Sequence, residues 1–271
     1  IFIMGNVTTI DGWTLTHINT ITGFQNGLCA FELDEVQDFD LENTEDTKEI
    51  KGGDGVLLNN IKTNKHVKGT GTNGILSAGL MATQTGSLET TTDGKVKFKD
   101  SVDVTATQAT SHSITLSQTP IGTAGAEIGY LWVKTSSGTV TKLTQATTAS
   151  AGKFSVSGTT VTFAEGAITS GDLVYGWYDI NLVDGTFAQI NNETNKFSGS
   201  AEIFVSGLAI NPCDEEAEFQ IHIPRASFSG NFNITYGDSQ TVHKFEFNSM
   251  KNKCTALKYF WNFKVFSLDE A

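Results

Sequence analysis

Short stretches of alternating apolar and polar residues are the feature that most constrains the fold of this 271-residue chain. In Phe219–Ile223 and Tyr259–Val265 the apolar side chains recur with a period of two, as in half-buried antiparallel strands. Gly, Asn, Asp and Ser separate such stretches almost everywhere, and Asn26-Gly27 is the strongest two-residue hairpin signal. Other breaks are expected at Asp11-Gly12 and Gly23. The pattern predicts an all-β, mainly antiparallel protein.

Composition limits the partners that such a protein could bind. The net charge is −12, and Arg225 is the only arginine. Guanidinium groups bind phosphate oxygens in pairs, so tight and specific binding of nucleic acid is not expected. An acidic surface instead repels DNA, which would suit a conduit through which DNA passes without adhering. No apolar run approaches the roughly 20 residues that span a bilayer, so we expect no membrane partner.

The composition of the sequence changes near Thr90, where short strands separated by frequent turns begin, and this change indicates two domains. Residues 93–179 contain about seven short strands closed by turns, which is typical of an immunoglobulin-like sandwich. We therefore predict a host β-sandwich or barrel formed by residues 1–92 and 180–271, with an inserted Ig-like β domain at residues 93–179. The predicted strands of the insertion are Lys95–Lys99, Ser113–Leu116, Glu127–Lys134, Thr139–Leu143, Lys153–Val156, Thr160–Phe163 and Asp172–Tyr178.

Longer strands are predicted in the last third of the host domain, at Phe197–Leu208, Glu216–Ile223, Ser227–Tyr236, Thr241–Phe247 and Leu257–Phe266. Their alternating rows predict the main core. These rows are Phe219, Ile221 and Ile223; Phe232, Ile234 and Tyr236; and Tyr259, Trp261, Phe263 and Val265. The Trp and Tyr residues lie mostly at alternating strand positions, which favours core positions over a sugar-binding platform.

One short helix is predicted between Asn73 and Thr85, with Thr72 or Asn73 as its N-cap and Gly86 as its end. It follows Gly69-Thr-Gly-Thr-Asn-Gly74, which matches the G-x-G-x-x-G pattern of dinucleotide sites. Such a site needs a βαβ unit, and the preceding Lys62–Lys68 is polar. The glycines are therefore interpreted as the entry to a structural helix, and no cofactor is expected.

An acidic stretch, Glu32–Asp54, has few apolar residues and is predicted to form a long loop or an extended hairpin. Asp38, Asp40, Glu42, Asp46 and Glu49 occupy positions 1, 3, 5, 9 and 12 of a calcium-binding loop. Asn43 replaces the usual glycine at position 6, and Glu45 replaces the usual apolar residue at position 8. A solvated acidic loop is the main interpretation, with a calcium site as the weaker alternative.

No catalytic constellation is visible. The five histidines lack metal-ligand spacing, and His222 alternates with Ile221 and Ile223 as a structural or surface residue does. No nucleophile is grouped with a histidine and an acid. The three cysteines are far apart, which fits a reducing cytosol rather than a disulfide framework. The sequence therefore predicts a protein that assembles rather than one that catalyses, with no metal or other cofactor.

Four segments suggest a family: Ile50–Leu57, Ser113–Ile121, Phe154–Phe163 and Gly171–Tyr175, together with the short helix after a Thr/Gly loop. In these the chain resembles virion structural proteins of tailed bacteriophages, and most resembles a tail tube protein with an immunoglobulin-like insertion. The resemblance implies hexameric rings that stack into a tube, sheets that line an acidic lumen, and a long loop that reaches the neighbouring ring. Partners would be further copies and other virion proteins, in a phage tail assembled in the bacterial cytoplasm.

Residues 34–60 are the candidate for that inter-subunit loop, with possible contacts at Asp34, Phe39, Leu41, Asp46 and Asp54. Two alternatives stay open. The chain could be a capsid-surface or decoration subunit, or it could be a carbohydrate-binding or adhesin module.

Overall fold

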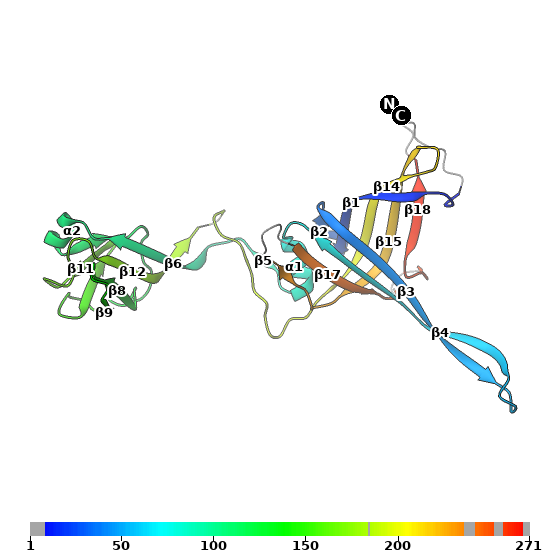
Figure 1. Cartoon of the computed structure of the whole chain (residues 1–271), viewed down its shortest axis with the longest axis horizontal. Helices are drawn as coiled ribbons and strands as arrows, with labels where there is room; N and C mark the ends of the chain where they lie inside the picture. Colours follow the sequence, from blue (N-terminus) through cyan, green and yellow to red (C-terminus); the bar gives the residue numbers. More distant parts are fainter. Residues whose placement is uncertain (1–8, 184, 236–241, 252–256, 268–271) are drawn as a thin grey trace. The chain divides into compact units, whose positions relative to one another are not determined.

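The computed structural model describes residues 9–183, 185–235, 242–251 and 257–267. The predicted all-β, mainly antiparallel fold class is confirmed, and two short helices occur in the described part of the chain (Figure 1). The chain forms two compact units. Residues 1–89 and 190–271 make up the first unit, and residues 90–189 make up the second.

A single twisted sheet forms the first unit. Its strand order is β2 (Leu28–Leu33), β1 (Thr14–Gln25), β14 (Ser200–Ile210), β15 (Glu216–Phe228), β17 (Val242–Ser249), β4 (Leu57–Asn73) and β3 (Val36–Lys51). Two further strands pair with this path: β16 (Ile234–Thr235) with β17, and β18 (Asn262–Phe266) with β15. β15 pairs with β17 only from Ala226 to Phe228. Its earlier residues, Glu218 to His222, pair with β18 instead.

The predicted hairpin turn at Asn26-Gly27 is confirmed. It joins β1 to β2, and both residues have positive φ angles of 52° and 78°, as a primed turn requires. The break predicted at Gly23 is wrong, because β1 continues through this residue. Gly23 instead lies directly opposite Phe31, whose ring occupies the space that a side chain at position 23 would need.

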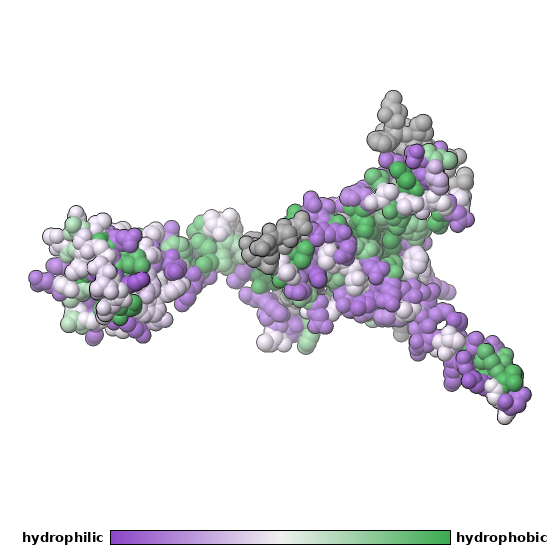
Figure 2. Space-filling view, in the orientation of Figure 1, coloured by the Kyte–Doolittle hydropathy of each residue, from purple (hydrophilic) through white to green (hydrophobic). Residues whose placement is uncertain are grey.

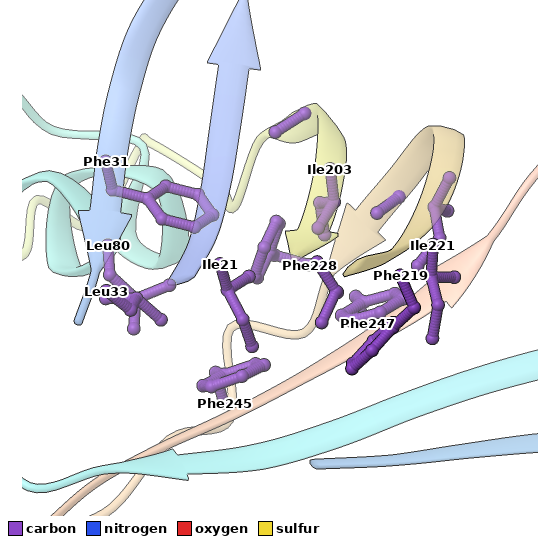
Figure 3. Close-up of a cluster of buried hydrophobic side chains, with 14 of the residues drawn as sticks. Ile21, Phe31, Leu33, Leu80, Ile203, Phe219, Ile221, Phe228, Phe245 and Phe247 are labelled. Atoms are coloured by element: carbon purple, nitrogen blue, oxygen red, sulfur yellow. The ribbon is translucent and has the colours of Figure 1, made fainter. Parts of the chain in front are cut away.

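The core of the first unit contains Phe219, Ile221 and Ile223, as predicted (Figure 3). Trp261 was expected beside them and is 38% exposed. It precedes β18, whose pairing with β15 begins only at Asn262. Phe263 and Val265, which do lie within β18, pack against the core.

The predicted strand Ser227–Tyr236 is also wrong. β15 ends at Phe228, and only Ile234 and Thr235 of the following segment pair, with β17. Ile234 is 43% exposed and so does not belong to a core row. Tyr236 lies outside the described residues.

The G-x-G-x-x-G stretch is part of the sheet rather than the entry to a helix. Gly69 and Gly71 belong to β4 and lie opposite Phe247 and Phe245 of β17. A β-carbon on either glycine would come within 2.5 Å of the facing ring. These glycines therefore let two large rings pack flat against the neighbouring strand.

Helix α1 (Ala78–Thr85) ends at Gly86, as predicted, with a φ of 71°. Its predicted start is wrong, because β4 extends to Asn73 and the N-cap is Ser77, whose side chain accepts from the Leu80 amide. Leu80 is buried in the core of the first unit. Gln84 fixes the other end of the helix to the sheet through a 2.8 Å hydrogen bond between its Oε1 and His243 Nε2.

All seven strands predicted between residues 93 and 179 are present in the second unit. Their order is β6 (Gly94–Asp103), β12 (Leu173–Leu182), β8 (Tyr130–Lys134), β9 (Val140–Gln145), β10 (Lys153–Ser157), β11 (Thr160–Phe163) and β7 (Ser113–Thr115). These strands share one core. β8 and β12 contribute Leu131 and Val174 to it, and β10 and β11 contribute Phe154 and Val161. β12 continues beyond Asp179 to Leu182, because its last residues pair with the start of β6.

Helix α2 (Ala106–Ser111) of the second unit was not predicted, because its Ala, Thr and Ser residues show no apolar periodicity. A capping box formed by Thr105 and Gln108 holds it in place. The chain enters and leaves this unit through the short pair β5 (Glu89–Thr90) and β13 (Gln189–Ile190).

The buried carboxyl of Asp100 forms several hydrogen bonds within the second unit. The Tyr178 hydroxyl donates to Asp100 Oδ2 at 2.8 Å, and the Ser117 amide donates to the same oxygen at 2.7 Å. Burial raises the pKa of the Asp100 carboxyl, but hydrogen bonds from Ser117, Tyr178 and Ser101 outweigh it and leave this pKa below its ordinary value. The pKa of Tyr178 is raised, first by burial and then by Asp100.

Candidate functional site

The residues proposed for a calcium loop do not come together. Asp38, Asp40, Glu42, Asp46 and Glu49 all lie along the extended strand β3. At about 3.3 Å per residue, roughly 35 Å of strand separates Asp38 from Glu49. Within the described ranges, no group of three or more His, Cys, Asp or Glu side chains could hold a metal ion.

The two buried histidines, His222 and His243, have structural surroundings. His222 Nε2 lies 2.6 Å from Glu202 Oε1, Nδ1 lies 3.1 Å from the Tyr259 hydroxyl, and the ring stacks on Phe204. His243 is fully buried and bonded to Gln84, and burial lowers its pKa. Neither histidine has a serine or cysteine nucleophile among these partners.

The cysteines form no cluster in the described part of the chain. Cys29 and Cys213 are free and exposed, and Cys254 lies outside the described residues. No helix of the described chain is long and apolar enough to cross a membrane.

One face of the first unit's sheet is polar and rich in carboxylates. Phe39, Leu41, Phe245 and Phe247 point to the core, so the residues alternating with them point to the opposite face. This acidic face includes eight carboxylates and three lysines: Glu32, Asp38, Asp40, Glu42, Glu202, Glu216, Glu218 and Glu246, against Lys68, Lys244 and Lys264. One ion pair, Lys68 with Glu246 at 3.2 Å, neutralises part of it.

The hairpin formed by β3 and β4 continues well beyond the sheet. β17 pairs with β4 only from Val67 to Asn73, whereas β3 and β4 pair with each other as far as Lys51 and Leu57 (Figure 1). Residues 42–66 are exposed on both faces, with the one exception of Gly52. We call residues 42–66 the outer ribbon. A two-stranded ribbon of this kind is marginally stable by itself in water.

Local chemistry shapes the outer ribbon. A register shift between Thr44 and Asp46 accommodates one extra residue of β4, and Asn64 takes a positive φ of 51° at this bulge. The Asn64 amide donates to Asp46 Oδ2 at 2.9 Å. At the end of the ribbon, the Gly52 amide donates to the Val56 carbonyl at 2.8 Å and closes the turn. Bulges of this kind bend a strand and increase its local twist.

The tip of the outer ribbon is apolar. Five large aliphatic side chains there are 38–67% exposed: Ile50, Val56, Leu57, Leu58 and Ile61. Figure 2 shows the resulting hydrophobic patch at the end of the hairpin. We call these five residues the apolar tip. Patches of this kind on an otherwise polar surface mark sites of interaction with other proteins.

A model of the YomU/Tube protein family matches residues 18–259. The chain belongs to this family. It is a phage-type tube protein family, as the resemblance implied. A comparison with curated proteins returns no match.

The residues predicted to contact a neighbour divide into two groups in this tube protein. Phe39 and Leu41 pack against the chain's own core, and the Phe39 ring lies 6.4 Å from that of Phe247. Asp34, Asp46 and Asp54 are exposed, in the turn before β3, at the bulge and in the terminal turn of the ribbon. The apolar tip was not predicted from the sequence, although Val56-Leu57-Leu58 directly follows the glycine-rich turn and could have indicated it.

The two edge strands of the sheet, β2 and β3, differ in what lies beside them. At one end, helix α1 lies against β2, so closely that a β-carbon on Gly79 would come 2.0 Å from the Ala30 carbonyl oxygen. At the other end, β3 pairs with β4 on one side and has no strand partner on its outer side in the described chain. An unpaired strand edge is a template for pairing with another chain.

Proposed function

We propose that this tube protein is a non-enzymatic virion protein that self-assembles into stacked rings and forms the tail tube of a phage. The observation that supports this most is the outer ribbon with its apolar tip. A fully exposed ribbon gains little from its own fold, whereas a neighbouring subunit could cover both of its faces. Burying a large aliphatic side chain contributes about 1.5–3 kcal/mol, and the tip offers five partly exposed ones in each subunit.

The edge of β3 from Asp40 to Lys51, which pairs with no further strand of the described chain, supports the same proposal. A neighbour that adds a strand to this edge would satisfy its backbone groups and extend the sheet from one subunit into the next. Contacts of this head-to-tail kind close into rings when the rotation between copies allows it. We propose rings of six copies, as the family resemblance implies.

The acidic face is the proposed lining of the tube. Its eight carboxylates outnumber its three lysines, so it would repel the phosphate backbone of DNA. DNA would then pass without tight binding. Assembly in the cytoplasm of the bacterial host, with other virion proteins as partners, completes the proposal.

The apolar tip offers a direct test. Leu57→Glu combined with Leu58→Glu places charges where the neighbour should bind, and we expect it to convert rings or tubes into monomers in negative-stain microscopy and analytical ultracentrifugation. Val140→Glu is the matched control, because Val140 is 49% exposed and Leu57 is 48% exposed. Assembly of the double variant at the wild-type concentration would contradict the proposal.

We also propose that residues 90–189 fold as a separable, Ig-like domain that faces outward from the assembly. The support is its own buried core, which includes Ile128, Phe154 and Tyr178. Replacing residues 91–188 by a short Gly/Ser linker should leave a host that folds and assembles. An insoluble deletion product, or an isolated 90–189 fragment without cooperative unfolding, would contradict this prediction.

A further inference from the structure

Four aromatic side chains cover one face of the second unit instead of entering its core. Tyr130 and Trp132 occupy alternate positions of β8, and Tyr175 and Trp177 occupy alternate positions of β12. Trp132 lies directly opposite Tyr175, and their rings stack at 5.6 Å with an interplanar angle of 16°. Trp132 also meets Tyr130 at 4.5 Å and Trp177 at 5.6 Å, in both cases edge to face. The four rings therefore form one continuous cluster.

The cluster lies outside the core, contrary to the expectation that the Trp and Tyr residues would be buried. Leu131, Val133 and Val174 alternate with the four aromatic residues and fill the core. Tyr130 is 42% exposed and Trp177 is 41% exposed. Cross-strand aromatic pairs do stabilise a sheet, but this role does not require positive charge around them.

Positive charge is concentrated around the rings. Residues 90–189 contain six lysines, and five of them fall on this face by strand alternation: Lys95, Lys97, Lys99, Lys134 and Lys142. Asp103 and Asp179 are the carboxylates of β6, β8, β9 and β12 that share the face, and Asp179 lies 3.5 Å from the Lys97 ammonium group. The face therefore carries a net charge of +3 (five lysines minus two aspartates), although residues 90–189 as a whole carry −2 (six lysines minus eight carboxylates).

Two of these lysines contact the rings directly. The Lys142 ammonium group lies 4.3 Å from the centroid of the Tyr130 ring, and that of Lys99 lies 5.4 Å from the Trp177 ring. Each ammonium thus stands beside an exposed aromatic surface, where it can reach an anionic group on a ligand that stacks on the rings. We call the four aromatic residues and the five lysines the aromatic–lysine face.

We propose that the aromatic–lysine face binds an acidic polysaccharide whose sugars carry carboxylates. The weakly positive C–H groups on one side of a sugar ring pack against the negative face of an aromatic ring. The lysines would bind the carboxylates, and the hydroxyls of Ser101 and Thr144 lie at neighbouring strand positions for hydrogen bonds with sugar hydroxyls. This is a binding function separate from tube assembly.

The charge pattern separates this ligand from two others. A neutral polysaccharide would give the lysines no anionic group to bind, so it should bind more weakly. Single-stranded DNA also stacks on aromatic rings, but the second unit contains no arginine and the whole chain carries −12. The observations therefore favour a carboxylated sugar polymer over nucleic acid.

The test uses the full chain with polygalacturonate as the probe, measured by calorimetry and by tryptophan fluorescence, with dextran and single-stranded DNA as comparison ligands. We expect binding to polygalacturonate that weakens with salt, and weaker or no binding to the other two. Tyr130→Ala with Trp177→Ala should weaken binding at least about tenfold, as expected for lost aromatic contacts. Lys99→Gln with Lys142→Gln should weaken it and reduce its salt dependence.

Matched variants test whether the effect belongs to this face. Trp261→Ala removes an aromatic residue of the first unit that is 38% exposed, and Lys153→Gln removes the lysine of residues 90–189 that lies on β10. Both should bind polygalacturonate as the wild type does, and thermal melting should show that all variants are folded. The proposal is overturned by no binding of polygalacturonate, by tighter binding of single-stranded DNA or dextran, or by equal losses in the control variants.

Discussion

The inner and outer halves of the β3–β4 hairpin belong to the same two strands, yet they have opposite environments. In the inner half, Phe39 and Leu41 pack on the core, because β17 lies beside β4 and contributes Phe245 and Phe247. In the outer half, Ile50, Leu57 and Leu58 remain exposed, because no further strand of the described chain continues the sheet there. An apolar residue on a strand is thus buried only where a neighbour exists to bury it. For the outer half, we propose that the neighbour is another subunit.

The largest difference between the halves should appear in their contributions to stability. Phe247→Ala removes a fully buried ring of β17 that packs on the inner half beside Phe39, and it should lower the free energy of unfolding by about 3–5 kcal/mol. Ile61→Ala in the outer half should change it by less than about 0.5 kcal/mol. Urea denaturation in the monomeric Leu57→Glu, Leu58→Glu background measures both. Equal effects would show that the outer ribbon is stabilised within its own subunit.

Hydrogen exchange should reveal the same boundary. In monomers we expect slow exchange in the inner half, whose β4 residues Val67–Asn73 pair on both sides, and fast exchange over residues 44–66. Assembly should slow exchange in residues 44–66 by at least about tenfold, because the neighbour covers them. Residues 14–25 of β1 serve as the internal control. Protection of residues 44–66 that is already complete in the monomer would contradict the proposed inter-subunit role.

The smallest expected effect concerns two histidines, His243 of β17 and His66 of the outer ribbon. Burial lowers the pKa of His243, which faces the core on β17, below its ordinary value near 6.5. The unfolded chain therefore binds a proton at higher pH than the folded chain does. The contribution of His243 to stability is complete above about pH 6.5 and declines as the pH falls below it.

Two variants isolate this contribution. His243→Asn should flatten the loss of stability between pH 7 and the acidic range in urea titrations. His66→Asn changes an exposed histidine of the outer ribbon and should leave the pH profile as it is in the wild type. A steep profile that persists in His243→Asn would mean that other groups cause it.

Much of the local structure was predictable because it depends on near neighbours in the sequence. The strands of residues 93–179, the Asn26-Gly27 turn and the end of helix α1 at Gly86 all follow from side-chain alternation or from residues that accept a positive φ. The scarcity of arginine and the net charge of −12 likewise limit the binding of nucleic acid without reference to the fold. These properties belong to the sequence by itself.

Burial and surface charge depended on strands that are distant in the sequence. A period of two determines which side of a strand a residue takes, but not whether another strand covers that side, so Phe263 is packed while Trp261 is exposed. The stretch predicted as an acidic loop is partly neutralised by β4, which pairs Lys62 with Glu45 at 3.0 Å. The outer ribbon consequently has five carboxylates and four lysines. The apolar tip and the aromatic–lysine face arise in the same way, because pairing between remote strands decided which apolar side chains were left in contact with water.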